Sequence, residues 1–353
     1  TAPPPTIPRW WRYPRTEGSQ GRPKAIAALA IHGIGVFAST AFSAAVTSGD
    51  YVLFWGVKGQ RFGAERILDT AFMTHPNHYM TPDYPPLVPL YYAWTMLGGD
   101  AAMDWWGGIA AAPLFLLLAV MAVWSFGKYA RIPVTDAITA LFASMFALLY
   151  IRHTLAGNAE PMLHFFAALA LGALIVQRRD ELDPIASVAL AGAAMTKVEG
   201  GVFALLVIAC SWPARFGSWK ERLLAGAKLA LLPCAALVTW LGFVQARGLT
   251  DHYVPGGGLS VAYLVPTLSA MAKELAMNLA YAPWIACAIL LGLAPAKRNA
   301  IPWLLAAAAF LAFLVVIAMR PNPHLEWTAG RTLLIPLLLS VFAVLAAWRE
   351  PRK

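Results

Sequence analysis

Long apolar runs separated by short polar segments make up most of this 353-residue chain. A helix crosses the roughly 30 Å hydrocarbon layer of a bilayer with about 20 apolar residues. Runs that approach this length predict membrane helices. They cover residues 25–46, 105–126, 135–151, 160–177, 223–246, 268–294, 300–319 and 333–348. The pattern therefore indicates an all-α, polytopic integral membrane protein.

One further apolar run, Ile185–Cys210, is interrupted at its middle by Lys197, Glu199 and the helix-weakening Gly200 and Gly201. Charges inside a membrane are costly and are usually paired or functional. The interruption predicts two short half-helices that meet in a hairpin near the outer surface. With the hairpin, the chain is expected to have about ten transmembrane helices.

Composition and charge support the same class of protein. Apolar residues make up 59% of the chain and charged residues 13%, whereas soluble domains carry about 25% charged residues. This excludes a water-soluble enzyme, a disordered chain and a protein with a nucleic-acid partner. The formal net charge of +9 is explained by membrane topology, because basic residues favour the cytoplasmic side.

The basic residues near the ends of the apolar runs predict which side each loop occupies. They all fall on one side if the hairpin crosses twice and both termini are cytoplasmic. These residues are Arg9, Arg12, Arg15, Arg22, Lys24, Lys128, Arg131, Arg178, Arg179, Arg215, Lys220, Arg222, Lys297, Arg298, Arg349, Arg352 and Lys353.

The segments outside the apolar runs divide the chain further. Residues 1–24 are basic and Pro-rich without an apolar core, which predicts a cytoplasmic tail and no signal peptide. Residues 25–348 are expected to form a single transmembrane domain, and 349–353 a second cytoplasmic tail. The largest external segment is the first loop, 47–104.

This first external loop contains two apolar, aromatic stretches that are too short to span, Tyr51–Phe62 and Leu87–Met96. Such stretches are typical of helices that lie in the membrane interface. Trp55 and Trp94 suit that depth, because tryptophan is enriched at the membrane–water boundary. The two helices could form the rim of a groove for a lipid substrate.

Five polar segments lie on one side of the predicted topology: Asp50 to Lys58, Asp83 to Leu90, Gly157 to Pro161, Thr196 to Gly200 and His324 to Leu334. They resemble the external loops of GT-C glycosyltransferases, in particular the protein mannosyltransferases that use dolichyl-phosphate-mannose and the aminoarabinose transferases of lipid A. Each motif alone is short, but together they occur in the family's order.

The resemblance implies an inverting enzyme that moves a sugar from a polyprenyl-phosphate donor to an acceptor hydroxyl at the outer face. Asp50 would be the general base on that hydroxyl. Glu160, also at the catalytic centre, would orient the acceptor, bind a divalent cation or tune Asp50. Arg331 and Lys197 would stabilise the phosphate leaving group. The remaining candidates, for substrate binding, are Lys58, Asp83, Tyr84, His324 and Glu326.

The chain departs from the family in one position that bears on metals. Tyr51 follows Asp50 where relatives often carry a second acidic residue, which weakens the case for a tight metal site and leaves a divalent cation as the one cofactor still open. The implied partners are the donor lipid, the bilayer and a glycolipid or protein acceptor. The expected location is a bacterial inner membrane, with the active site facing the periplasm.

Two other functions stay open. A broken helix carrying Lys197 and Glu199 is also typical of transporters, although no inverted repeat is evident. The basic Arg9-Trp10-Trp11-Arg12 segment fits a non-catalytic subunit that docks onto a larger membrane complex. A purely structural interpretation also stays open for two residues: Arg331 would anchor a helix end, and Lys197 would pair with Glu199 to satisfy the broken hairpin.

Overall fold

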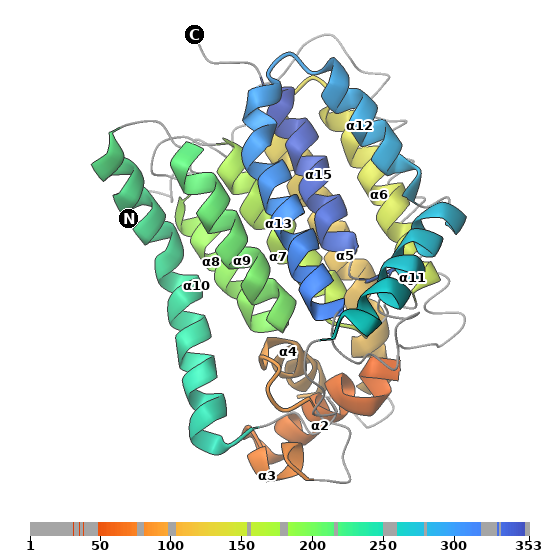
Figure 1. Ribbon diagram of the computed structural model, residues 1–353. Coiled ribbons are helices and arrows are strands. Elements are labelled where there is room, and N and C mark those ends of the chain that lie inside the picture. Colours follow the sequence, from red (N-terminus) through yellow and green to blue (C-terminus); the bar gives the residue numbers. More distant parts are fainter. Residues whose placement is uncertain are drawn as a thin grey trace, which may run out of the picture.

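The computed structural model is a bundle of helices with a smaller helical cluster at one end (Figure 1). It describes residues 31, 35, 38, 49–75, 81–97, 104–153, 157–176, 183–214, 218–249, 260–278, 281–318, 330–331 and 333–349. Across these residues the chain forms helices and no strand, which confirms the all-α prediction. The expected first span, 25–46, falls almost wholly outside the described residues.

The bundle helices reproduce most of the predicted apolar runs within a few residues. They are α5 (Asp104–Tyr129), α6 (Thr135–Arg152), α7 (Glu160–Val176), α8 (Asp183–Thr196), α9 (Val198–Ser211), α10 (Trp219–Arg247), α11 (Leu264–Met277), α12 (Pro283–Leu293), α13 (Ile301–Ala318) and α15 (Leu334–Ala347). Single helical turns extend or connect them at η4 (Trp212–Ala214), η5 (Val261–Tyr263) and η7 (Lys297–Ala300).

Four stretches among the described helices are long and apolar enough to cross a membrane. They are Ala110–Tyr129, Thr135–Arg152, Trp219–Arg247 and Lys297–Ile317. Several other helices are equally apolar but shorter, including α7 and α15. A membrane protein of several helices is therefore supported by length and composition.

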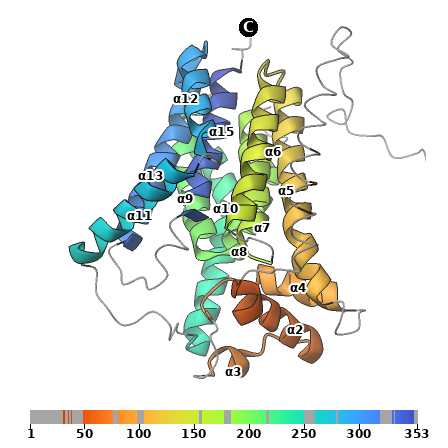
Figure 2. The same cartoon turned by 90° about the vertical axis from the view of Figure 1, so that its right-hand side faces the viewer.

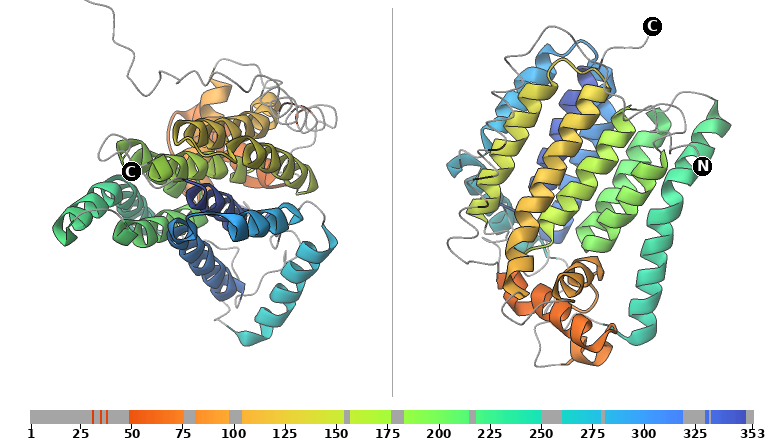
Figure 3. Two further views of the ribbon diagram at one scale, coloured as in Figure 1. Left: turned by 90° about the horizontal axis from the view of Figure 1, so that it is seen from above. Right: turned by 180° about the vertical axis from the view of Figure 1, so that it is seen from behind.

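The interrupted run at 185–210 is two helices, as predicted. Lys197 has an extended backbone (φ −158°, ψ 157°) between the end of α8 and the start of α9. The two helices pack against each other (Figure 3). The break therefore places Lys197 and the first turn of α9, with Glu199, at one end of the bundle.

The single helix predicted over 268–294 is wrong. The chain leaves the helical conformation at Asn278 (φ −113°, ψ 103°), and α12 begins at Pro283. Proline favours the first helical position because it has no N–H to donate back to a preceding turn. The continuous apolar composition concealed this break. In Figure 2, α11 crosses the bundle at a steep angle while α12 runs along it.

The smaller cluster comes from the segment predicted to be the first external loop and contains η2 (Tyr51–Trp55), α2 (Gly56–Glu65), α3 (Thr70–Met73) and α4 (Leu87–Met96). The predicted short helices over 51–62 and 87–96 are thus confirmed as helices, and α3 is additional. Asp69 caps α3, because its Oδ1 accepts from the N–H of Phe72 at 2.9 Å and its Oδ2 from Arg61 at 2.8 Å. These bonds lower the pKa of the Asp69 carboxyl.

The helix α10 ties this cluster to the bundle. Its 29 residues give a length of about 43 Å, and its last turns pack beside the cluster (Figure 1). There Trp240 is buried with Phe62, Met73 and Ala93. The indole N–H of Trp240 also donates to the carbonyl of Asp83 at 2.8 Å. Near its middle, α10 exposes apolar side chains such as Leu231, Val238 and Leu241.

The centre of the bundle is built on α7 and α15, both buried along almost their whole length. Seen from above, α7 and α15 lie inside the ring of other helices (Figure 3). Both helices begin at the end that faces the smaller cluster. This arrangement matters for the site, since Glu160 is the first residue of α7 and Arg331 lies just before α15.

Candidate functional site

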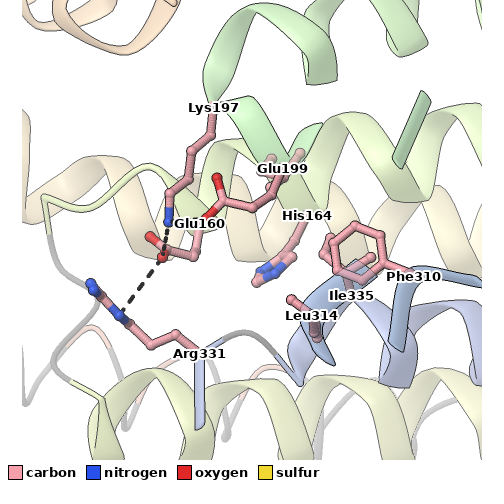
Figure 4. A pocket seen from close by; sticks show the side chains of 9 residues that line it. Glu160, His164, Lys197, Glu199, Phe310, Leu314, Arg331 and Ile335 are labelled. Atoms are coloured by element: carbon pink, nitrogen blue, oxygen red, sulfur yellow. Dashed lines mark hydrogen bonds and ion pairs between the residues drawn. The ribbon is translucent and has the colours of Figure 1, made fainter. Parts of the chain in front are cut away.

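Five charged side chains form a continuous chain at the end of the bundle beside the smaller cluster. We call it the ion chain: Asp50, Arg331, Glu160, Lys197 and Glu199. Arg331 Nη1 lies 2.7 Å from Asp50 Oδ2, and Arg331 Nε lies 3.8 Å from Glu160 Oε1. Lys197 Nζ lies 3.0 Å from Glu160 Oε1 and 3.2 Å from Glu199 Oε1. Figure 4 shows Lys197 and Arg331 reaching Glu160 from two sides.

The members of the ion chain come from separate parts of the sequence. Asp50 precedes η2, Lys197 is the residue between α8 and α9, and Asp50 and Arg331 are 281 positions apart. The side chain of Glu160 is only 5% exposed, and those of Lys197 and Arg331 are 14% and 15% exposed. Three carboxylates and two cations are thus held largely out of water, which is costly unless each charge is compensated.

Tyr51 fixes the position of Asp50. Its ring packs so closely on Gly56, Gly108 and Gly157 that a Cβ at any of the three would lie within 2.8 Å of it. Gly157 also has a φ of +81°, a left-handed conformation that favours glycine. Tyr51 is therefore an anchor for the adjacent Asp50.

A second set of contacts fixes the backbone next to Arg331. The hydroxyl of Tyr281 donates to the carbonyl of Gly330 at 2.9 Å and lies 3.5 Å from His153 Nε2. The His153 ring occupies the space that a Cβ at Gly330 would need. Glu274 Oε1 in turn lies 3.6 Å from His153 Nε2. The backbone position next to Arg331 is thus determined by the ends of α6 and α11 and by the start of α12.

A small cavity of about 20 Å³ opens beside the ion chain, enough for about one water-sized group. Its polar lining is Glu160, Lys197, Glu199, Arg331 and His164, and its apolar lining comes from α7, α13 and α15. Figure 4 shows His164 between the charged residues and Phe310, Leu314 and Ile335.

His164 is a site residue that the sequence analysis missed. It lies one turn after Glu160 on α7, is fully buried, and its Nδ1 is 2.8 Å from the hydroxyl of Tyr150. The available signal was the spacing, because residues four apart share one face of a helix.

Three predicted substrate-binding residues, Lys58, Asp83 and Tyr84, belong to the smaller cluster, and Tyr84 also interacts electrostatically with Lys197. Lys58 is buried and donates to the carbonyl of Thr81 at 2.7 Å. The Tyr84 ring packs at 5.7 Å from that of Trp55, and the carbonyl of Asp83 accepts from α10. These residues hold the smaller cluster together. His324 and Glu326 lie outside the described residues.

The structure also bears on the divalent cation left open at Glu160. Within the described part of the chain, no three His, Cys, Asp or Glu side chains are grouped to hold a metal ion. Glu160 Oε1 is instead shared by Lys197 and Arg331. The charge of Glu160 is thus paired with cations of the protein itself.

Comparisons of the chain with protein-family models, curated proteins and solved structures found no match.

Proposed function

We propose that this protein is a membrane glycosyltransferase that moves a sugar from a polyprenyl-phosphate donor to an acceptor hydroxyl, with inversion. The observation that carries the proposal is the ion chain. It joins a carboxylate held beside interfacial-type helices, Asp50, to two buried cations, Arg331 and Lys197. A base and a cationic site for a phosphate are the two groups that such a transfer requires.

In the proposed topology the protein spans a bacterial inner membrane with about ten helices and both termini in the cytoplasm. The end with the ion chain and α2–α4 faces the periplasm. Support comes from the apolar helices and from large apolar side chains that are exposed on the bundle surface, such as Leu231 on α10 and Leu305 on α13. The short helices α2 and α4 would lie in the outer interface, near the headgroups of a lipid donor.

In the proposed reaction, Arg331 pairs first with Asp50 and then with the donor phosphate. The donor phosphate competes with Asp50 for Arg331, so its binding frees the carboxylate. Asp50 then takes the proton of the acceptor hydroxyl, whose oxygen attacks C1 of the sugar. The bond between C1 and the phosphate oxygen breaks, and its electron pair leaves with the polyprenyl phosphate. Arg331 and Lys197 stabilise the charge that develops on that phosphate.

The test needs neither substrate to be known. Protein-, lipid- and polysaccharide-linked glycans would be compared in the parent strain, a deletion strain, and the deletion strain restored with Asp50→Asn. Asp136→Asn serves as the matched control, since Asp136 pairs with Lys128 far from the ion chain. Protein levels and thermal stability are matched between variants.

We expect one sugar to vanish on deletion, to return with Asp136→Asn, and to stay absent with Asp50→Asn. That sugar and the molecule it is attached to would name both substrates. If no glycan changes, the protein is not such a transferase and the transporter or subunit functions move ahead. If Asp50→Asn restores the sugar fully, Asp50 is not the base.

A further inference from the structure

Three buried atoms around the small cavity make no hydrogen bond to any described residue: Glu160 Oε2, Glu199 Oε2 and His164 Nε2. Both carboxylates use Oε1 for Lys197, so each keeps its second oxygen unpaired. His164 uses Nδ1 for Tyr150 and keeps Nε2 unpaired. All three residues line the same cavity.

Such atoms are expensive to bury. An unsatisfied buried polar atom costs about 1–3 kcal/mol, and more when it belongs to a charged group. Nearly all buried polar atoms in native proteins have a partner. Three exceptions around one cavity are therefore the expected lining of a site that binds a polar group.

We propose that His164, Glu160 and Glu199 bind a single hydroxyl group in this cavity. The volume of about 20 Å³ admits about one oxygen-sized group. Ionised carboxylates only accept hydrogen bonds, so the bound group must donate to them. When Tyr150 donates to Nδ1 of His164, the proton of the neutral ring sits on Nε2, so the bound group must also accept.

A hydroxyl does both, whereas other small polar groups do not. An ammonium group has no acceptor for the His164 N–H. A carboxylate or phosphate would be repelled by the unpaired oxygens of Glu160 and Glu199. Water has two hydrogens and can donate to both carboxylates, whereas a sugar hydroxyl has one and donates to one of them. The two also differ in when they bind.

The inference has two halves. Water fills the site in the free protein, and a hydroxyl of the donor sugar displaces this water when the donor binds. Only the second half rests on the proposed transferase function. The cavity adjoins Lys197 and Arg331, which are the proposed phosphate contacts. A sugar linked to that phosphate would therefore present a hydroxyl at this depth. His164 would then contribute to sugar specificity, because it binds one particular hydroxyl of the donor sugar.

The sugar half is tested with purified full-length protein in lipid nanodiscs. The probe is the polyprenyl-phosphate sugar identified by glycan profiling, together with its monodeoxy analogues. His164→Phe keeps a ring of similar size, and His164→Gln keeps an N–H donor. Thermal midpoints establish that both variants fold.

In the wild type, removal of one particular hydroxyl should lower kcat/KM by about 10- to 100-fold. His164→Phe should lower kcat/KM for the complete donor by a similar factor, yet show no further loss with that deoxy analogue. His164→Gln should recover part of the activity. If the effects of His164→Phe and of every deoxy analogue simply multiply, His164 does not bind the sugar and the proposal fails.

The water half is tested without any donor. Solid-state NMR of protein labelled with ¹⁵N-histidine, with His164→Gln to assign the signal, should show a neutral ring protonated at Nε2 and in contact with water. If the free protein shows no water at Nε2, the site does not exist as proposed. This outcome is independent of transfer, so it separates failure of the hydroxyl site from failure of the proposed function.

Discussion

The two ends of the bundle use the same residue types in opposite ways. At the end where α5 leads into α6, Lys128 and Asp136 pair at 2.6 Å, eight residues apart, with side chains 34% and 21% exposed. At the other end, Lys197 pairs with Glu160 across 37 residues, and Glu160 is almost fully buried.

At the first end, the Lys128–Asp136 pair is local and in contact with water. Arg349, which follows α15, caps α7 by donating to the carbonyls of Ile175 and Val176. Ser218 and Glu221 form a reciprocal cap at the start of α10. Helix ends leave such backbone groups unpaired, so this end is explained by architecture alone. The ion chain instead leaves buried oxygens unpaired, which favours a functional origin.

The largest effect expected is on stability when the central cation is removed. Lys197→Met would leave the buried Glu160 beside Glu199 without the cation that lies between them. Removal of one partner of a buried pair costs about 3–5 kcal/mol, so the free energy of unfolding should fall by about that much. The measurement is denaturant unfolding in detergent micelles.

The matched control is Lys128→Met at the opposite end. Its partner Asp136 stays in contact with water, so the cost should be about 1 kcal/mol or less. Equal costs for the two substitutions would remove the distinction between the two ends.

The next largest effect concerns the anchor of Asp50. Gly157→Ala introduces a Cβ that meets the Tyr51 ring at 2.7 Å and lies at a φ of +81°. Gly248→Ala shares the positive φ (+60°) but meets no atom within 4 Å. The left-handed backbone alone costs about 1–2 kcal/mol, and overpacking adds about 1–3 kcal/mol.

We therefore expect Gly157→Ala to be the more destabilising of the two and to lower the proposed transfer as well. Thermal midpoints and the glycan assay measure the two effects. Full transfer by a folded Gly157→Ala variant would show that Tyr51 does not determine the position of Asp50.

A smaller effect is expected at the opposite end from Arg349→Met. It removes a charged donor from the carbonyls of Ile175 and Val176, and hydrogen bonds to charged groups contribute about 1.5–3 kcal/mol. The thermal midpoint should fall while transfer per folded molecule stays unchanged. A loss of transfer at full stability would mean that this end also takes part in function.

Much of the fold followed from the periodicity and length of apolar runs. The break at Lys197 and the short helix Leu87–Met96 were predicted at the observed positions, because charges and run lengths are local signals. The break between α11 and α12 was missed, since apolar residues continue through it and only Asn278 and Pro283 indicate it.

The site was predicted as separate residues but not as a chain. Asp50, Glu160, Lys197 and Arg331 were each identified from resemblance and charge. Their pairing was not, because it depends on how α7, α15 and the α8–α9 turn pack. His164 was missed for the same reason. A histidine on an apolar helix is recognised as a site residue only when Glu199 from another helix is seen to line the same cavity.

The smallest expected effect tests the ion chain most directly, because it separates the position of Arg331 from the stability of the whole protein. Tyr281→Phe removes the bond to the Gly330 carbonyl, and Ser340→Ala removes the bond from Trp284 Nε1 at 2.9 Å. Each should lower the free energy of unfolding by about 1 kcal/mol. Only Tyr281→Phe frees the backbone beside Arg331, so only it should reduce transfer, by raising KM for the lipid donor more than it lowers kcat. Equal transfer by both variants would mean that the pairing of Arg331 with Asp50 and Glu160 is enough to hold it.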